Sequence, residues 1–197
     1  MKKKYQQIKT IIISLALSLV IILSLIPSAY ADTDTSSLFI WDGTVSAKFD
    51  SGSGSAQTPY IIKTAEQLAY FAYLVNSGDD FRGKYVKLEA DIKLNDTSNL
   101  QNWGDHPEIS YTFLPKNTFL SIGSKQKPFG GSFDGNGHTI YGAFIYSNKD
   151  NVGLFGYTES SAAITNLNIR DSYIQSNDYV GSVKSHIQVH STTQNIA

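Results

Sequence analysis

Residues 140–148 read IYGAFIYSN, and parts of this pattern return further along the chain. The spacing Ile-x-x-Ala-x-Ile of residues 140–145 recurs 24 residues later as Ile-x-x-Leu-x-Ile at 164–169, IYSN at 145–148 recurs as IQSN at 174–177, and Val-Gly at 152–153 recurs 28 residues later at 180–181. Short apolar runs separated by Asn and Gly are typical of a β-solenoid, which places apolar residues inside and Asn or Gly at tight corners. One turn of such a coil cannot bury its own inner face, so we expect several turns to stack.

Upstream of these repeats, Tyr85–Leu94 alternates between apolar and charged residues. A period of two predicts a strand in a half-buried sheet. The predicted inward set is Val86, Leu88, Ala90, Ile92 and Leu94, and the predicted outward set is Lys87, Glu89, Asp91 and Lys93. We expect another short apolar strand at Leu38–Trp41.

The clearest helix is predicted over residues 64–77. Thr64 and Gln67 have the spacing of a capping box, and Gly78 can adopt the left-handed conformation that ends a helix. The apolar residues follow the i, i+3, i+4, i+7 pattern that places them on one face, namely Leu68, Phe71, Ala72 and Val75. We therefore expect this helix to cover a core.

Two stretches are predicted to be loops. Residues 51–55 read SGSGS, but a phosphate-binding loop is excluded because no Gly-Lys-Ser/Thr follows and no helix begins there. Residues 95–118 are polar and irregular, which predicts either a functional loop or a disordered one.

Six blocks of the chain form a recognisable series. They are TPYII at 58–62, TAEQL at 64–68, GKYVKLEADIKL at 83–94, SIG at 121–123, FGGSFDGNGHTI at 129–140 and VGLFG at 152–156. Together they resemble the N-terminal part of bacterial surface proteins with GLUG-type repeats, and the motif itself is Gly153–Gly156. The resemblance runs from about Trp41 to Gly181. It implies a right-handed parallel β-helix, as found in large adhesin-like proteins and beside the protease domain of immunoglobulin-A-cleaving metalloproteases, and it supplies no catalytic residues.

The predicted fold is therefore all-β, a short right-handed parallel β-helix (solenoid) over residues 59–183 with the helix at 64–77 capping its N-terminal end. Residues 32–58 are expected to hold an N-terminal lead and a first strand. A second Gly-Leu-x-Gly is expected after Val180, but the chain departs from the repeat there and continues with polar residues. We expect 184–197 to be a disordered tail or the truncated end of a longer protein, and the exposed C-terminal edge to self-associate.

The N-terminus has the three parts of an export signal. Lysines precede an apolar run at 11–26, and small residues Ala29 and Ala31 precede polar sequence. The run is shorter than the roughly 20 residues needed to span a bilayer. We therefore predict a cleaved signal peptide at 1–31, a secreted or cell-surface location, and no other membrane contact.

The mature chain is expected to be acidic. Removing 1–31 takes away four lysines and no acidic residue, which leaves 12 basic and 17 acidic residues and a net charge of −5. Nucleic-acid binding is disfavoured because it needs a basic surface. The chain has no cysteine, which excludes disulfides, a thiolate nucleophile and Cys-ligated zinc.

No residue is assigned a catalytic, cofactor-binding or metal-binding role. Asp134 and His138 lie close together in DGNGH, but Asp-Gly and Asn-Gly favour a double turn, with His138 entering a strand. Glu89 and Asp91 are outward carboxylates of the kind that glycosidases use, yet Lys87 and Lys93 flank them as on a solvated face. The histidines His106, His138, His186 and His190 lack metalloprotease spacing.

Four aromatic residues in polar surroundings are candidates for contact with a ligand, namely Trp103, Tyr111, Tyr146 and Tyr179. Exposed Tyr and Trp can stack on sugars or anchor a protein partner, and partial burial at corners is the structural alternative. The partner remains undetermined, with carbohydrate or a surface protein as candidates.

The sequence favours an exported surface or adhesin-like binding or structural module without enzymatic activity. The alternative is a polysaccharide lyase or glycoside hydrolase on the same scaffold, which would need a carboxylate cluster with a basic residue in one outer groove. A third interpretation is a fragment of a larger surface protein.

Overall fold

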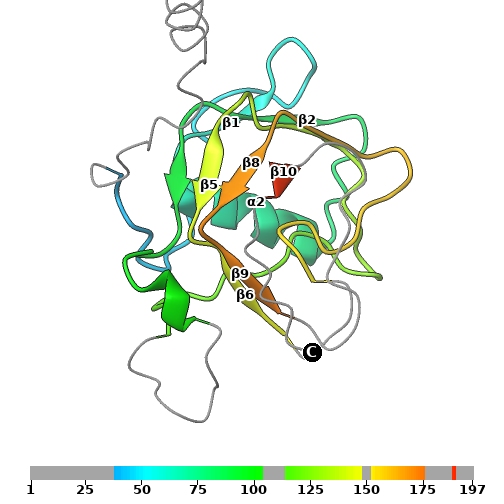
Figure 1. Cartoon of the computed structure of the whole chain (residues 1–197). Coiled ribbons are helices and arrows are strands. Elements are labelled where there is room, and N and C mark those ends of the chain that lie inside the picture. Colours follow the sequence, from blue (N-terminus) through cyan, green and yellow to red (C-terminus); the bar gives the residue numbers. More distant parts are fainter. Residues whose placement is uncertain (1–37, 104–113, 148–151, 176–187, 190–197) are drawn as a thin grey trace, which may run out of the picture. The chain divides into compact units, whose positions relative to one another are not determined.

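The computed structural model describes residues 38–103, 114–147, 152–175 and 188–189 (Figure 1). The chain divides into two units, Met1–Ser36 and Ser37–Ala197, and all described residues belong to the second. The predicted signal peptide at 1–31 and most of the predicted tail at 184–197 lie outside the described residues. None of the helices in the described part combines the length and apolar character needed to cross a membrane.

Short strands pair in parallel within three sheets (Figure 1). The first sheet has the order β1 (Tyr60–Ile62), β2 (Tyr85–Leu88), β4 (Ser132–Asp134) and β7 (Ala163–Thr165). The second has the order β10 (Gln188–Val189), β8 (Asn168–Arg170), β5 (Thr139–Tyr141) and β3 (Ile92–Lys93), and the third pairs β6 (Phe144–Tyr146) with β9 (Tyr173–Gln175). Along the chain, β4, β5 and β6 are thus followed by β7, β8 and β9 in the same three sheets.

The strand register stacks apolar residues on one another. In the first sheet Phe133 lies between Val86 and Ile164, and all three are buried. In the second sheet Ile140 lies between its register partners Ile92 and Ile169, and all three side chains are buried. In these two stacks each central side chain is buried against the equivalent side chain of the neighbouring strand, which removes apolar surface from water.

This register corrects the repeat expected from the sequence. Ile140 pairs with Ile169, 29 residues later, and Ile164 instead pairs with Phe133. The recurrence of IYSN as IQSN is the structural one, because Ile145 pairs with Ile174. Several alignments place apolar residues on apolar residues, and only the register that also matches the corners between strands is realised.

The corner between the second and third sheets has the same conformation in two successive copies. Gly142 follows Tyr141 with φ 68°, and Asp171 follows Arg170, the register partner of Tyr141, with φ 49°. Left-handed residues at equivalent positions turn the chain in the same way each time. A Cβ at Gly142 would lie 2.8 Å from the carbonyl oxygen of Asn95, so this corner is also closely packed.

The stretch predicted as one strand over 85–94 is two strands in different sheets. β2 ends at Leu88 and β3 begins at Ile92, with the chain turning between them. Lys93, predicted to point outward, is 9% exposed. The predicted strand at Leu38–Trp41 is reduced to one parallel bridge from Ile40 to Lys93. The alternation of residue types does not reveal where a strand bends, because residues on both sides of the bend remain half-buried.

Helix α2 (Ala65–Ser77) is the predicted helix. The Thr64 hydroxyl accepts a hydrogen bond from the Gln67 amide at its start, and Gly78 adopts the left-handed conformation at its end. The Gln67 side chain accepts from the Lys63 amide at 2.8 Å, one residue before the position expected for a capping box. In Figure 1 the helix passes behind β5 and β8. Its buried Phe71 stacks on Phe133 at 5.6 Å, so the apolar face packs into the core.

The two ends of the 95–118 insertion are held together by asparagine side chains. Asn95 Nδ2 donates to the Asn117 carbonyl at 2.8 Å, and the Asn117 amide donates to Asn95 Oδ1 at 3.0 Å. A short 3₁₀ helix, η2 (Leu100–Asn102), follows the first end. This insertion therefore leaves the strand stack and returns to it at a fixed point.

The predicted tail contributes one strand to the stack. Gln188 and Val189 form β10 and pair in parallel with Asn168 and Ile169 of β8. The sequence shows no further turn of the repeat after Lys184, whereas these two residues pair with β8; the disordered or truncated tail stays a prediction. The remainder of 184–197 lies outside the described residues, and self-association of this end stays a prediction.

Candidate functional site

The acid and histidine of the DGNGH motif do not form a pair with each other. Asp134 Oδ1 accepts hydrogen bonds from the Asn136 amide at 2.8 Å and from Asn166 Nδ2 at 3.0 Å. Asn136 and Gly137 have φ of 52° and 80°, which builds the predicted tight turn. His138 directly precedes β5, as expected of a residue entering a strand.

The predicted outward carboxylates Glu89 and Asp91 are engaged by different partners. Asp91 Oδ1 lies 3.0 Å from His138 Nδ1 and accepts from the Thr139 amide at 2.9 Å. Glu89 lies 3.8 Å from Lys63 Nζ. Asp91 therefore holds the start of β5, and Glu89 contributes to an ion pair. Across the described ranges, no three His, Asp or Glu side chains are grouped so that they could hold a metal ion.

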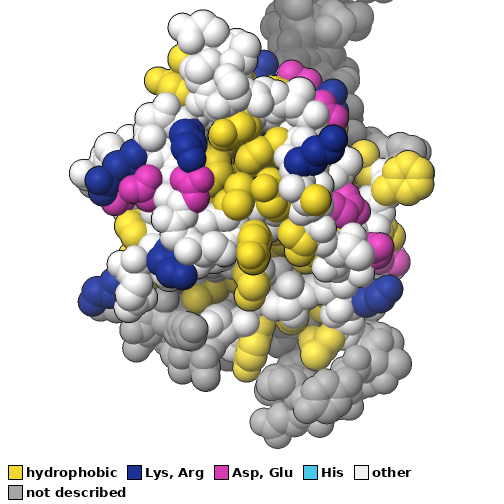
Figure 2. Space-filling view, turned by 180° about the vertical axis from the view of Figure 1, so that it is seen from behind, with side chains coloured by type: hydrophobic (Ala, Val, Ile, Leu, Met, Phe, Trp, Pro, Cys, Tyr) yellow, Lys and Arg dark blue, Asp and Glu magenta, His cyan; other side chains and the backbone are white. Residues whose placement is uncertain are grey.

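The two aromatic candidates that the structure describes differ in exposure. Trp103 is 3% exposed, packs edge-to-face on Phe144 at 5.8 Å and donates to Asn99 Oδ1, so burial, the structural alternative to ligand contact, applies to this residue. Tyr146 is exposed on β6. Tyr111 and Tyr179 lie outside the described residues, as do His106, His186 and His190. Figure 2 shows hydrophobic side chains gathered on the face opposite to that of Figure 1, with basic and acidic side chains on both sides of them.

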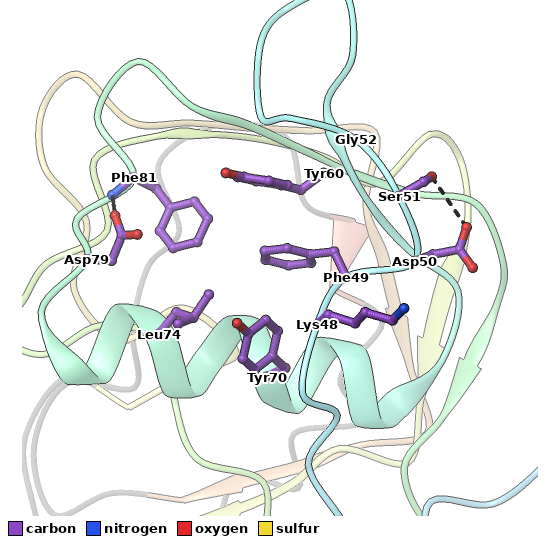
Figure 3. Close-up of a pocket in the computed structure, with 10 residues that line it drawn as sticks. All are labelled: Lys48, Phe49, Asp50, Ser51, Gly52, Tyr60, Tyr70, Leu74, Asp79 and Phe81. Atoms are coloured by element: carbon purple, nitrogen blue, oxygen red, sulfur yellow. Dashed lines mark hydrogen bonds between the residues drawn. The ribbon is translucent and has the colours of Figure 1, made fainter.

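A pocket of about 520 Å³ provides a site that the sequence did not reveal (Figure 3). Four segments contribute its walls, which are the 48–52 segment, β1, α2 and the turn after α2. The lining residues are Lys48, Phe49, Asp50, Ser51, Gly52, Tyr60, Tyr70, Leu74, Asp79 and Phe81.

The glycine-rich loop positions the first wall of this pocket. The Asp50 amide donates to the Ile61 carbonyl, and the Ile61 amide donates to the Ser51 carbonyl, both at 3.0 Å. Gly52 has φ 93°, and a Cβ there would lie 1.8 Å from the Pro59 carbonyl oxygen. A Cβ at Gly54 would lie 2.4 Å from the Tyr60 ring. Glycine at both positions lets the loop lie flat on the start of β1.

Three half-buried rings form the aromatic part of the pocket. Phe49 stacks on Tyr60 with ring centroids 4.5 Å apart and planes 17° apart. Tyr70 of α2 meets Phe49 edge-on at 5.3 Å. Phe81 closes the opposite side, perpendicular to Phe49 at 6.3 Å, and continues inward to Phe71 at 5.0 Å (Figure 3). The pocket is therefore the outer end of the aromatic cluster in the core.

Phe81 occupies this wall in an unusual backbone conformation. Its φ is 58°, which is uncommon for a bulky residue and carries strain. Asp79 Oδ1 accepts from its amide at 3.1 Å, and its carbonyl accepts from the Lys84 amide at 2.9 Å. The Lys84 ammonium lies 5.0 Å from the Phe81 ring centroid, within cation–π range. These contacts hold the ring against the core on one side and the pocket on the other.

Both carboxylates of the pocket are paired with lysine. Asp50 lies 2.9 Å from Lys63 Nζ, and Asp79 lies 2.7 Å from Lys84 Nζ. The hydrogen bond from Lys63 lowers the pKa of Asp50, and the same bond together with the charge of Asp50 raises the pKa of Lys63. Lys48 forms no ion pair with any described residue.

The sequence contains little signal for this site. Its rings come from positions 49, 60, 70 and 81 in four separate segments, and only tertiary packing brings them together. The one local clue is the SGSGS loop between Phe49 and Tyr60, which was correctly predicted to be a loop.

No family model matches the chain, and no solved structure matches it. It is similar to halomucin of Haloquadratum walsbyi, with 28% identity over 143 residues that cover 72% of this chain and 1% of halomucin. It is also similar to a protein of Evansella cellulosilytica named as a Gly-rich membrane protein, with 31% identity over 130 residues that cover 66% of this chain and 13% of that protein. The likeness thus spans only a small part of each relative's own length.

Proposed function

We propose that this chain is an exported surface module without enzymatic activity, which uses a rigid β scaffold to present a binding pocket. The two relatives favour a surface or membrane-associated protein, since one of them is named as a membrane protein. The finer, adhesin-like role rests on the pocket, which is the single observation that carries the proposal.

The scaffold that we propose is a short right-handed parallel β-helix of the GLUG-repeat type. The parallel register and the repeated left-handed corner support it. Two of the motif blocks also pair with each other. Ile122 forms a parallel bridge with Phe155. Its amide donates a hydrogen bond to the Leu154 carbonyl at 2.8 Å, and the Gly156 amide donates to the Ile122 carbonyl at 2.9 Å.

Binding fits the pocket better than catalysis. A general acid or base works best when its pKa lies near the operating pH. The pKa of Asp50 is instead lowered by Lys63, and Asp79 is held by Lys84 on the opposite side of the pocket (Figure 3). These charges are already neutralised by partners, so they suit the recognition of a ligand in its ground state.

The proposed function is tested on intact cells that produce the full chain. Added protease is expected to cleave the protein from outside, or the protein is expected in the medium, while a cytoplasmic marker stays intact. The purified mature chain is expected to release neither reducing nor unsaturated sugars from a panel of polysaccharides. Protection of the chain inside intact cells would contradict the surface location, and released sugars that disappear in an Asp50→Asn or Asp79→Asn variant would establish the lyase or hydrolase alternative.

A further inference from the structure

The volume of the pocket is typical of a small-molecule site. Its volume of about 520 Å³ falls within the range of roughly 300–1,000 Å³ that is common for such sites. Protein partners usually meet broader and flatter surfaces of roughly 800 Å² on each side. The dimensions therefore favour a compact ligand or one unit of a polymer.

The aromatic walls add apolar surface to the pocket. Phe49, Tyr60 and Tyr70 are half-buried, although the stacked and edge-to-face contacts already fix their orientations. Rings that are held in place lose little conformational entropy when a ligand packs on them. Leu74 of α2 adds aliphatic surface on the same side (Figure 3).

Polar groups surround these rings. Within the described part of the chain, the hydroxyl groups of Tyr60 and Tyr70 have no hydrogen-bond partner, and Figure 3 shows the Tyr60 hydroxyl directed toward the side of the pocket that holds Phe81. Ser51 and Asp50 lie at one end and Asp79 at the other. A ligand that packs on the rings can therefore exchange several hydrogen bonds at its margin.

The charges of the pocket disfavour a cationic ligand. Each carboxylate has a lysine partner, Lys63 for Asp50 and Lys84 for Asp79. Lys48 adds a positive charge to the lining. A quaternary ammonium group seeks aromatic rings too, but a pocket with neutralised carboxylates and an added lysine gives it no net attraction.

We infer that this pocket binds one pyranose unit, uncharged or anionic, of a polysaccharide. A pyranose ring has a face of C–H groups that packs on aromatic rings and a rim of hydroxyl groups that both donate and accept hydrogen bonds, which matches the arrangement of Phe49, Tyr60 and Tyr70 with the polar ends of the pocket. The inference rests on the proposed binding function and names its ligand class.

The test uses the purified mature chain and soluble oligosaccharides built from glucose, mannose, galactose, N-acetylglucosamine or galacturonic acid. Binding is measured by calorimetry, and saturation-transfer NMR identifies the sugar protons that contact the protein. At least one sugar is expected to bind with saturation on C–H protons of one ring face. Tyr70→Ala is expected to weaken binding at least about tenfold, because it removes a ring and a hydroxyl group from the pocket.

The same helix supplies a matched control. Tyr73 lies three residues further along α2, is 59% exposed and does not line the pocket, so Tyr73→Ala is expected to bind within about twofold of wild type. Tyr70→Phe keeps the ring and is expected to bind more weakly than wild type but more tightly than Tyr70→Ala. Far-UV circular dichroism verifies that all three variants retain the fold.

Three results would overturn the inference: no sugar of the panel binds, a sugar binds equally well to wild type and Tyr70→Ala, or the Tyr70-dependent ligand is a Leu- and Phe-rich peptide added as a separate arm of the panel. Each of these can occur while the chain is still found at the cell surface, which would leave the surface location standing. Conversely, a chain confined to the cytoplasm that nevertheless binds sugar through Tyr70 would contradict the surface location alone.

Discussion

At the scale of single residues, Gly52 and Gly54 determine whether the pocket can exist. Both have positive φ, and both lie where a side chain would collide with Pro59 or Tyr60. Gly83 also has positive φ, 69°, but has open space around its Cβ position. The two kinds of glycine separate the effect of backbone conformation from the effect of close packing.

Gly52→Ala is therefore expected to destabilise the fold more than Gly83→Ala. Each substitution places alanine in the left-handed region, which costs roughly 1–2 kcal/mol. At Gly52 the new Cβ would also displace the Pro59 carbonyl from a distance of 1.8 Å, which we expect to cost at least about 1 kcal/mol more. Denaturant unfolding of both variants measures the difference. Equal losses of stability would show that the loop does not lie on β1 as described.

Tyr173 of β9 offers a second residue-scale prediction, on pH. Its ring stacks on Phe144 at 5.6 Å, and burial raises the pKa of its hydroxyl group, with Tyr146 adding to the effect. The folded state therefore favours the neutral phenol. The stability that this group contributes is complete below the ordinary tyrosine pKa of about 10 and is lost as the pH rises through the higher folded-state value.

We accordingly expect the stability of wild type relative to Tyr173→Phe to be constant from pH 7 to about pH 9 and to fall above about pH 10. Urea unfolding of the two proteins across this range gives the comparison. A stability difference that does not change with pH would mean that Tyr173 titrates alike in the folded and unfolded chain.

At the scale of elements, α2 contains its own start and stop signals, whereas the strands depend on their neighbours. The cap at Thr64, the stop at Gly78 and the buried face at Leu68 and Phe71 all follow from residues within one segment. The bend between β2 and β3 has no such local signal. It depends on the pairing of β1 with β2 before the bend and on the pairing of β5 with β3 after it.

Thr64→Ala is expected to lower the free energy of unfolding by about 0.5–2 kcal/mol, because the Gln67 amide loses its hydrogen-bond acceptor. Ser77→Ala, near the exposed end of the same helix, is expected to change it by less than about 0.5 kcal/mol. Thermal unfolding, followed by circular dichroism at the helix wavelength of about 222 nm, compares the two variants. A Thr64→Ala variant as stable as Ser77→Ala would exclude the cap.

The sequence therefore predicts the helix, the SGSGS loop and the DGNGH turn, because each is encoded by neighbouring residues. It predicts that apolar residues repeat, and the recurrence of IYSN as IQSN already has the 29-residue separation of Ile140 and Ile169, but the 24-residue match of Ile140 to Ile164 is an equally apolar alignment that the structure does not use. For Trp103 the sequence leaves ligand contact and burial as alternatives, and it cannot decide between them because Phe144 packs on this residue from a distant segment. The pocket was missed for the same reason, since its rings belong to four segments.

At the scale of the whole described unit, the parallel register links the core to the pocket. Phe155, Phe133 and Phe71 are in contact through ring pairs, and Phe71 reaches the pocket wall through Phe81. The chain has no cysteine, so this packing and the strand ladders must hold the fold without disulfides. A pocket attached in this way is rigid only if the strands stack in the register described.

The absence of native cysteine allows the central claim, parallel stacking of successive strand sets, to be tested by one disulfide. Ser132 and Ala163 are register partners on the outward side of β4 and β7, so a Ser132→Cys, Ala163→Cys double variant is expected to form an intramolecular disulfide under mild oxidation. The control pairs Ser132→Cys with Thr165→Cys, two residues further along β7, where a disulfide needs backbone movement. Mass spectrometry of peptides from both variants is expected to find the crosslink in the first and free thiols in the second. Crosslinking of the 132–165 pair in preference to the 132–163 pair would contradict the register, and with it the parallel stack that supports the pocket.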